Sequence, residues 1–131
     1  FKMAINLMPT DFKAHYNLGI ALFAGQKNED AIAHYKKAIK LQPNYTSAHY
    51  NLGNALFAVK ETEEAISHYK IAIKLQPNLA DAHYNLGYAL VQKGEMKEAA
   101  HHFRETIKLR PDLVAARDSL EFALLRSQEL E

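Results

Sequence analysis

The chain has 131 residues, of which 48% are hydrophobic, and its 16 basic and 15 acidic residues leave a formal net charge of +1. These values are typical of one ordinary globular domain. The charge balance argues against a nucleic-acid partner, because such a protein usually carries a basic stripe. No apolar run approaches the roughly 20 residues that a membrane span requires, and cysteine is absent. With no signal peptide visible, we expect a cytoplasmic protein without a membrane partner.

A six-residue sequence, Ala-His-Tyr-Asn-Leu-Gly, occurs three times with a spacing of 34 residues, at 14–19, 48–53 and 82–87. The four prolines keep the same step, at Pro9, Pro43, Pro77 and Pro111. A fixed period of this length indicates a repeat protein, in which one helical unit buries its apolar face only against its neighbours. Function is therefore expected on the surface that the repeats form together and not in a catalytic cleft.

In chain order, residues 1–9 match the end of a repeat and are expected to be the last part of a truncated preceding unit. Three full repeats follow at 12–45, 46–79 and 80–113. The whole of 1–131 is thus expected to be a single repeat domain. The apolar Phe1, Ile5 and Met8 suggest possible self-association through the truncated N-terminal end.

Each repeat is predicted to contain two helices. The first begins after a residue able to cap it, namely Thr10, Asn44 or Asn78, and ends near Gly25, Lys60 or Gly94. The second begins near Asn28, Thr62 or Met96, with acidic residues in its first turns, and the proline that follows Leu41, Leu75 or Leu109 by two residues stops it.

Residues 114–131 are predicted to form a C-terminal capping helix, roughly 113–128, with Asp112 as its cap. Glu121 occupies the position at which the repeats have glycine, which would block the close approach of a further helix. The expected covering face is Leu113, Ala116, Leu120 and Leu124, and the expected water-facing side chains are Arg117, Asp118, Glu121 and Arg126.

The repeating positions resemble the tetratricopeptide repeat pattern. In the middle unit they are His49, Leu52, Gly53, Leu56, Ala65, Tyr69, Ala72 and Pro77. The departures are histidine where the family most often has tryptophan, and Thr106 in place of the second alanine. The resemblance implies an all-α, right-handed superhelical solenoid of antiparallel helix pairs, with a concave groove that binds peptides.

An α-helix turns about 100° per residue, which separates two arcs on the first helix of each repeat. His49, Leu52, Gly53 and Leu56 fall on one arc, which we expect to pack. The opposite arc carries aromatic and apolar side chains in a stripe, which usually marks a binding site, beside a row of asparagines. The predicted peptide-binding residues are Tyr16, Asn17, Ile20, Phe23, Tyr50, Asn51, Asn54, Phe57, Tyr84, Asn85, Tyr88 and Val91.

The asparagine row, Asn17, Asn51 and Asn85, is similar to the asparagine ladder of the tetratricopeptide superhelix in O-linked N-acetylglucosamine transferase. A carboxamide both donates and accepts, so it can pair with a peptide backbone of any sequence. The alternative is that these residues serve packing between repeats. A clamp for the C-terminal carboxylate of chaperone tails is not expected, because Ser47 and Asp81 are not basic and Lys13 stands alone.

No nucleophile–base pair, phosphate loop or paired carboxylate motif stands out, so we expect no enzyme activity, catalytic residue or cofactor. Six of the seven histidines recur with the repeat, and packing explains them better than a metal site. The leading hypothesis is a protein–protein interaction scaffold that binds an extended peptide segment. The alternatives are a targeting or substrate-recognition module of a larger enzyme, such as a glycosyltransferase, and a self-assembling structural scaffold.

Overall fold

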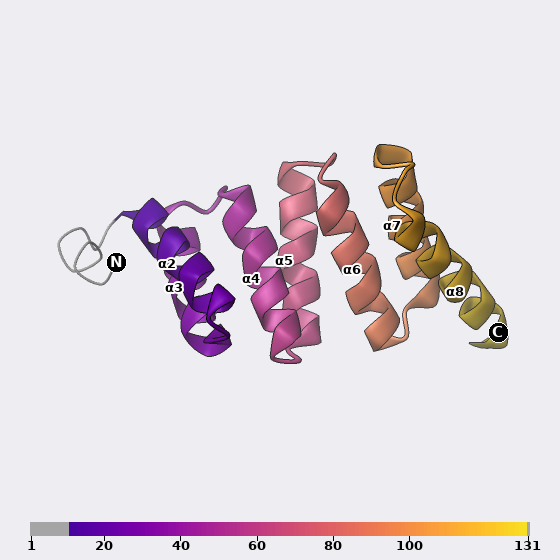
Figure 1. The fold of residues 1–131 in the computed structure, drawn as a ribbon, viewed down its shortest axis with the longest axis horizontal. Coiled ribbons are helices and arrows are strands. Elements are labelled where there is room, and N and C mark those ends of the chain that lie inside the picture. The colour runs from indigo at the N-terminus through magenta and orange to yellow at the C-terminus, as the bar shows by residue number, and fades with distance from the viewer. Residues whose placement is uncertain (1–10, 131) are drawn as a thin grey trace. The chain divides into compact units, whose positions relative to one another are not determined.

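The computed structural model describes the backbone of residues 11–130 and the side chains of residues 11–128. This part of the chain contains seven α-helices and no strand (Figure 1). The fold class is therefore the all-α helical-repeat solenoid. The helices are α2 (Phe12–Ala24), α3 (Asn28–Leu41), α4 (Thr46–Ala58), α5 (Thr62–Leu75), α6 (Ala80–Lys93), α7 (Met96–Leu109) and α8 (Val114–Leu130).

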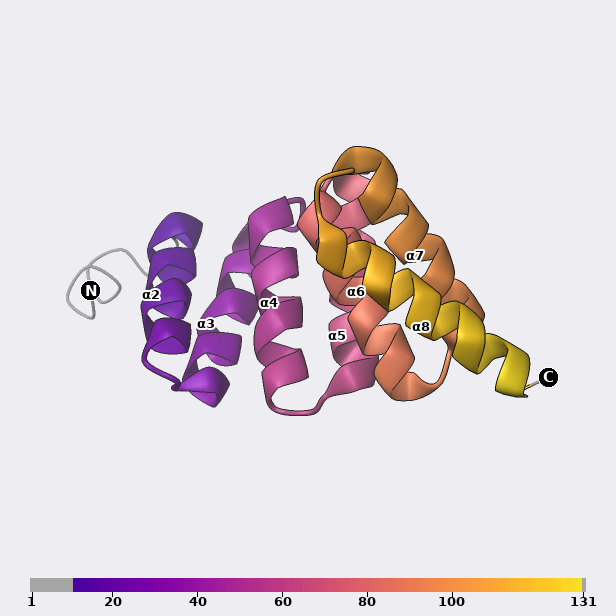
Figure 2. The same cartoon turned by 45° about the vertical axis from the view of Figure 1, so that its right-hand side comes forward.

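The chain divides into two compact units, Phe1–Leu75 and Gln76–Glu131. In the first unit, α2 lies against α3 and α4 against α5, and α3 joins the two pairs through its contact with α4. In the second unit, α6 lies against α7, and α8 packs on α7 and touches α6 (Figure 2). Within the described ranges, no helix is both long enough and apolar enough to cross a bilayer.

Each helix pair closes through an aromatic ring on a glycine. A Cβ atom on Gly19 would lie 2.6 Å from Tyr35, and one on Gly53 would lie 2.7 Å from Tyr69. These rings are almost fully buried. The glycine is required because any side chain would occupy the space that the ring fills. The same contact joins Gly87 to the third ring, Phe103.

The predicted packing arc is confirmed, since His49, Leu52, Gly53 and Leu56 are all buried. The predicted starts and ends of the second helices are also confirmed: α3, α5 and α7 begin at Asn28, Thr62 and Met96. The repeat boundaries themselves stay a prediction. The truncated unit at 1–9, with Phe1, Ile5 and Met8, and the cap at Thr10 lie outside the described residues.

The predicted caps of the first helices were wrong. Tyr45 and Leu79, not Asn44 and Asn78, directly precede α4 and α6, and neither makes a side-chain cap hydrogen bond. The backbone N–H of Tyr45 bonds to the carbonyl of Gln42, which places Asn44 inside a turn. The helix α2 is capped by Asp11, whose carboxylate accepts from the backbone N–H groups of Lys13 and Ala14.

The predicted covering face of the last helix was wrong in part. The fully buried residues of α8 are Ala116 and Ala123, whereas Leu124 is exposed. Small side chains let α8 approach α7 closely, so the larger Leu124 turns outward. The residue that directly precedes α8 is Leu113 and not Asp112.

Candidate functional site

The twelve predicted peptide-binding residues lie on the first helices of the repeats, and none of them is buried. Four come from α2 and four from α4, in the first unit, and four come from α6, in the second. The most exposed large apolar members are Ile20, 39% exposed, and Tyr88, 49% exposed. Every one of these helices therefore presents an accessible stripe opposite its buried arc.

The Tyr16 ring contacts the ring of Tyr45, a residue that was not among the predicted site residues. The Tyr45 ring lies 4.9 Å from the Tyr16 ring and 5.2 Å from the Phe12 ring, measured between centroids. Tyr45 precedes α4 and so lies outside both helices of its repeat. The equivalent positions hold Leu79 and Leu113, so no periodic signal marked it as part of the stripe.

The asparagine row is not uniform in its contacts. The carboxamide nitrogen of Asn51 donates to the Tyr16 hydroxyl at 2.9 Å and to the Ser47 carbonyl at 3.0 Å. The first of these bonds joins α4 to α2, which is the packing role that the sequence left open. Asn17 is exposed and makes no side-chain hydrogen bond within residues 11–128. Among the described side chains of the first unit, then, the carboxamide of Asn17 and the oxygen of Asn51 make no hydrogen bond.

Asn54 also has a partner within the fold. The Tyr69 hydroxyl donates to Asn54 Oδ1 at 2.6 Å. The corresponding pair in the preceding repeat is Tyr35 and Ile20, where the hydroxyl of Tyr35 is buried and has no hydrogen-bond partner. Burial raises the pKa of both tyrosines well above the ordinary value, with smaller contributions from Tyr16 and Tyr50. Both hydroxyls are therefore neutral at physiological pH.

A histidine pair crosses between the two helices of every repeat. The Nδ1 atoms are 3.2 Å apart in His15–His34, 3.0 Å apart in His49–His68 and 3.0 Å apart in His83–His102. The sequence showed both sets of histidines and their period but not their contact, because the distance between two helices is not a feature of either helix alone.

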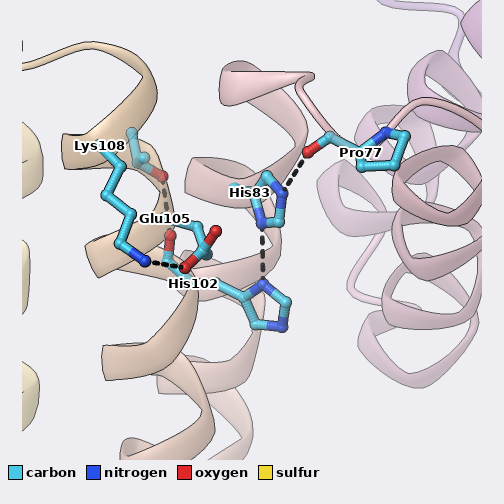
Figure 3. A network of polar contacts seen from close by, with 6 residues as sticks. Pro77, His83, His102, Glu105 and Lys108 are labelled. Atoms are coloured by element: carbon cyan, nitrogen blue, oxygen red, sulfur yellow. Dashed lines mark hydrogen bonds and ion pairs between the residues drawn. The ribbon is translucent and has the colours of Figure 1, made fainter.

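The backbone assigns the proton positions in two of these pairs. Nε2 of His83 lies 3.0 Å from the carbonyl of Pro77 (Figure 3), and Nε2 of His49 lies 2.8 Å from that of Pro43. A carbonyl only accepts, so both Nε2 atoms carry a proton and each neutral ring accepts at Nδ1. Nδ1 of His102 and of His68 must then donate.

The environment of His68 favours this neutral state. Burial lowers the pKa of His68, and the neighbouring His49 lowers it further; Glu64 opposes these two effects, and Lys36 adds the smallest lowering. Within the described side chains, no three histidine or acidic groups gather as a metal ion would require. The pairs therefore act as hydrogen bonds between the two helices of each repeat.

The second unit contains a hollow of about 320 Å³ between α6, α7 and α8. Its lining includes Tyr88 and Val91 of the predicted stripe on α6, Phe103 of α7, and Asp118 and Phe122 of α8. Phe122 is 48% exposed. Asp118 is exposed, as the sequence predicted. Phe122 was not among the predicted site residues, because α8 was expected to act only as a cover.

Comparison with known proteins identifies a family for this architecture. Family profiles match as "TPR repeat" over residues 21–60 and 53–94, and as "Tetratricopeptide repeat" over residues 80–113. No curated protein sequence matches the chain.

Several solved structures are similar to the chain. A crystal structure of MamA is 30% identical, with a TM-score of 0.91 over 93% of this chain and 71% of that one. YrrB, described as a TPR protein with an unusual peptide-binding site, is 25% identical, with a TM-score of 0.88 over 98% and 66%. The first TPR of Spaghetti (RPAP3), solved with the HSP90 peptide SRMEEVD, is 24% identical, with a TM-score of 0.84 over 91% and 92%, which is a likeness of fold.

Proposed function

The chain belongs to the tetratricopeptide repeat family, and we propose that it is a protein–protein interaction scaffold that binds an extended peptide segment of a partner along the first helices of its repeats. The observation that carries the proposal is the contrast within those helices. One arc is buried, while the opposite arc keeps twelve accessible residues, all of them aromatic, apolar or asparagine. The peptide-binding site described for YrrB and the peptide bound to Spaghetti support it at the level of the family.

The side chains of the first unit suggest how a peptide would be held. Tyr50 and Phe57 on α4 offer apolar surface for its side chains. Asn17 can both donate to and accept from its backbone, whereas Asn51 can only accept a backbone N–H, because its own N–H groups already bond to Tyr16 and Ser47. Hydrogen bonds of this kind would favour an extended segment, because its backbone N–H and C=O groups are not paired with one another.

The test uses peptides selected on the full chain from a displayed library of random sequences. Truncating Tyr50 or Phe57 to alanine should weaken binding by on the order of tenfold each, as expected for aromatic contacts at an interface. Ala58→Ser is the matched control, since Ala58 is exposed on the same helix. Affinities unchanged by both aromatic substitutions, with the fold intact by circular dichroism, would contradict the proposal.

Self-association is a second candidate function, favoured by the exposed apolar side chains of α8. Val114 is 66% exposed and Leu125 is 55% exposed, and such side chains in a cluster often mark an interface. Light scattering over a concentration series tests this candidate. A molecular mass that stays monomeric at the highest concentration would eliminate it.

A further inference from the structure

We propose that α8 is part of the binding surface, and that the hollow between α6 and α8 takes one large apolar side chain of a peptide that carries a lysine or arginine next to it. This inference rests on the proposed function and deepens it, because it names the chemistry of the bound segment.

The size and walls of the hollow fit one apolar side chain. Its volume is about 320 Å³, and Tyr88 and Phe122 stand on opposite sides as half-exposed rings. The fully buried Phe103 adds a third aromatic ring to the lining. An apolar side chain that enters would remove both half-exposed rings from water, and burial of aromatic surface dominates the energetics of such contacts.

The stripe of α6 leads directly into this hollow. Tyr84 and Tyr88 are stacked, with centroids 6.2 Å apart and planes 11° apart, and Tyr84 in turn contacts Phe103 at 5.8 Å. Tyr88 thus belongs both to the stripe and to the wall of the hollow. A peptide lying along α6 would bring one of its side chains to this place.

The charge around the hollow selects a basic neighbour. Asp118 lines it, and Asp118 and Glu121 also line a second hollow, of about 340 Å³, which shares Phe122 with the first. No lysine or arginine lines either hollow. Asp118 has no ion-pair or hydrogen-bond partner among the side chains of residues 11–128, and complementary charge at the edge of an interface sets specificity.

Arg126 is the cation of α8 that lies beside Phe122. Its guanidinium carbon lies 5.8 Å from the centre of the Phe122 ring, outside the lining of both hollows. The nearest other cation on α8, Arg117, donates to the carbonyl of Pro111 at 2.9 Å and is held at the start of the helix. The occupant expected here is therefore an apolar residue beside a basic one, and not an acidic segment.

The experiment selects random displayed peptides on the full chain and compares four variants. Phe122→Ala should weaken the selected peptides by on the order of tenfold, and Asp118→Lys by about two- to fivefold. Repeating the selection on Asp118→Lys should replace the basic residue by an acidic one. The controls are Val114→Ala, an exposed apolar residue of α8 outside both hollows, and Asp112→Lys, the same charge change away from them; both should bind as the unaltered chain does.

Each outcome decides the inference. An apolar–basic pattern that depends on Phe122 and Asp118 supports it. Peptides that lose affinity with Tyr50→Ala but not with Phe122→Ala leave the proposed function standing and overturn the inference. Selection of acidic peptides overturns it as well, and a failure to select any peptide overturns both. A dimer of the chain that Phe122→Ala dissociates would identify a second copy as the occupant in place of a partner's peptide.

Discussion

The first two repeats pack their two helices in the same way but differ in whether a buried tyrosine hydroxyl has a hydrogen-bond partner. In both, a tyrosine ring of the second helix rests on a glycine of the first, at nearly equal distances. The Tyr69 hydroxyl donates to Asn54, whereas Ile20 occupies the equivalent sequence position in the first repeat and the Tyr35 hydroxyl has no hydrogen-bond partner among the described residues. Two repeats with the same helix packing can therefore differ in stability, because the tyrosine hydroxyl is hydrogen-bonded in one repeat and not in the other.

The third repeat has no tyrosine hydroxyl at this position. Phe103 replaces the tyrosine, and Tyr88 takes the place of Asn54. There is then no hydroxyl to satisfy beneath the helix, and Tyr88 is 49% exposed. The ring is required in every unit, and the polar atom on it is optional.

The largest effect is expected where the two repeats agree. Gly53→Leu would place a side chain in the space of the Tyr69 ring. Overpacking of this kind costs typically about 1–3 kcal/mol, and it should weaken the neighbouring pair as well, since repeats share stability through their contacts. Chemical denaturation measures the loss.

Gly25→Ala is the matched control for this substitution. A Cβ atom on Gly25 would meet only backbone oxygens at 3.6 Å, so this variant should unfold at nearly the denaturant concentration of the unaltered chain. Equal unfolding midpoints for Gly53→Leu and Gly25→Ala would show that the ring does not need the glycine.

The second-largest effect is expected when the hydrogen bond from the Tyr69 hydroxyl to Asn54 is removed. Asn54→Leu would leave the Tyr69 hydroxyl buried without an acceptor, which costs about 1–3 kcal/mol. The same substitution combined with Tyr69→Phe should cost much less, because no donor is then left unpaired. A double-mutant cycle by urea denaturation measures the coupling, and a coupling energy near zero would argue that the bond contributes nothing.

The converse substitution, at Ile20, should give the Tyr35 hydroxyl a hydrogen-bond acceptor. Ile20→Asn would offer Tyr35 the acceptor that Tyr69 already has, with an expected gain of about 0.5–1.5 kcal/mol. Ile20→Ala removes the same apolar group without adding an acceptor and is the control. If the asparagine variant were no more stable than the alanine variant, the hydroxyl would not be reaching the new side chain.

The smallest effect concerns pH. Because the folded-state pKa of His68 lies below the ordinary value of 6.5, the neutral ring stabilises the fold. This contribution is fully present above pH 6.5 and is lost as the pH falls through the folded-state value. Urea denaturation of the unaltered chain at about pH 7.5 and about pH 5.5 should therefore show lower stability in acid.

His68→Gln should reduce this pH dependence, because the glutamine amide can still donate to His49 and does not titrate. His101→Gln changes an exposed histidine outside the three pairs and should retain the pH dependence of the unaltered chain. The assignment fails if the glutamine at position 68 leaves the acid sensitivity undiminished.

The sequence predicted most of the helices because their signals are local or periodic. The proline step and the recurring glycine located α3, α5 and α7 correctly. The caps before α4 and α6 were missed because Asn44 and Asn78, which are favourable cap residues by type, lie in turns closed by backbone hydrogen bonds. The helices therefore begin one residue later than predicted. Residue type ranks the candidates for a cap, and the turn geometry decides which one is used.

The candidate site was less predictable because its features depend on distances between helices. Nothing in the sequence distinguishes Asn17 from Asn51, yet the Tyr16 hydroxyl engages only the second. Phe122 fell outside the expected covering face of α8, and only the small Ala116 and Ala123 beneath the helix explain why that ring remains at the surface. Tyr45 was missed because it occurs in one repeat alone.

The proton positions in the histidine pairs give the second and the third repeat a spectroscopic signal each. His68 and His102 must hold their protons on Nδ1, while His49 and His83 hold theirs on Nε2. The two tautomers differ in the nitrogen chemical shifts of the ring, so an ¹⁵N-labelled chain would report on both units through separate resonances. Separation of one helix pair would return its rings to the mixture of tautomers found in water, and partial unfolding could be followed one repeat at a time.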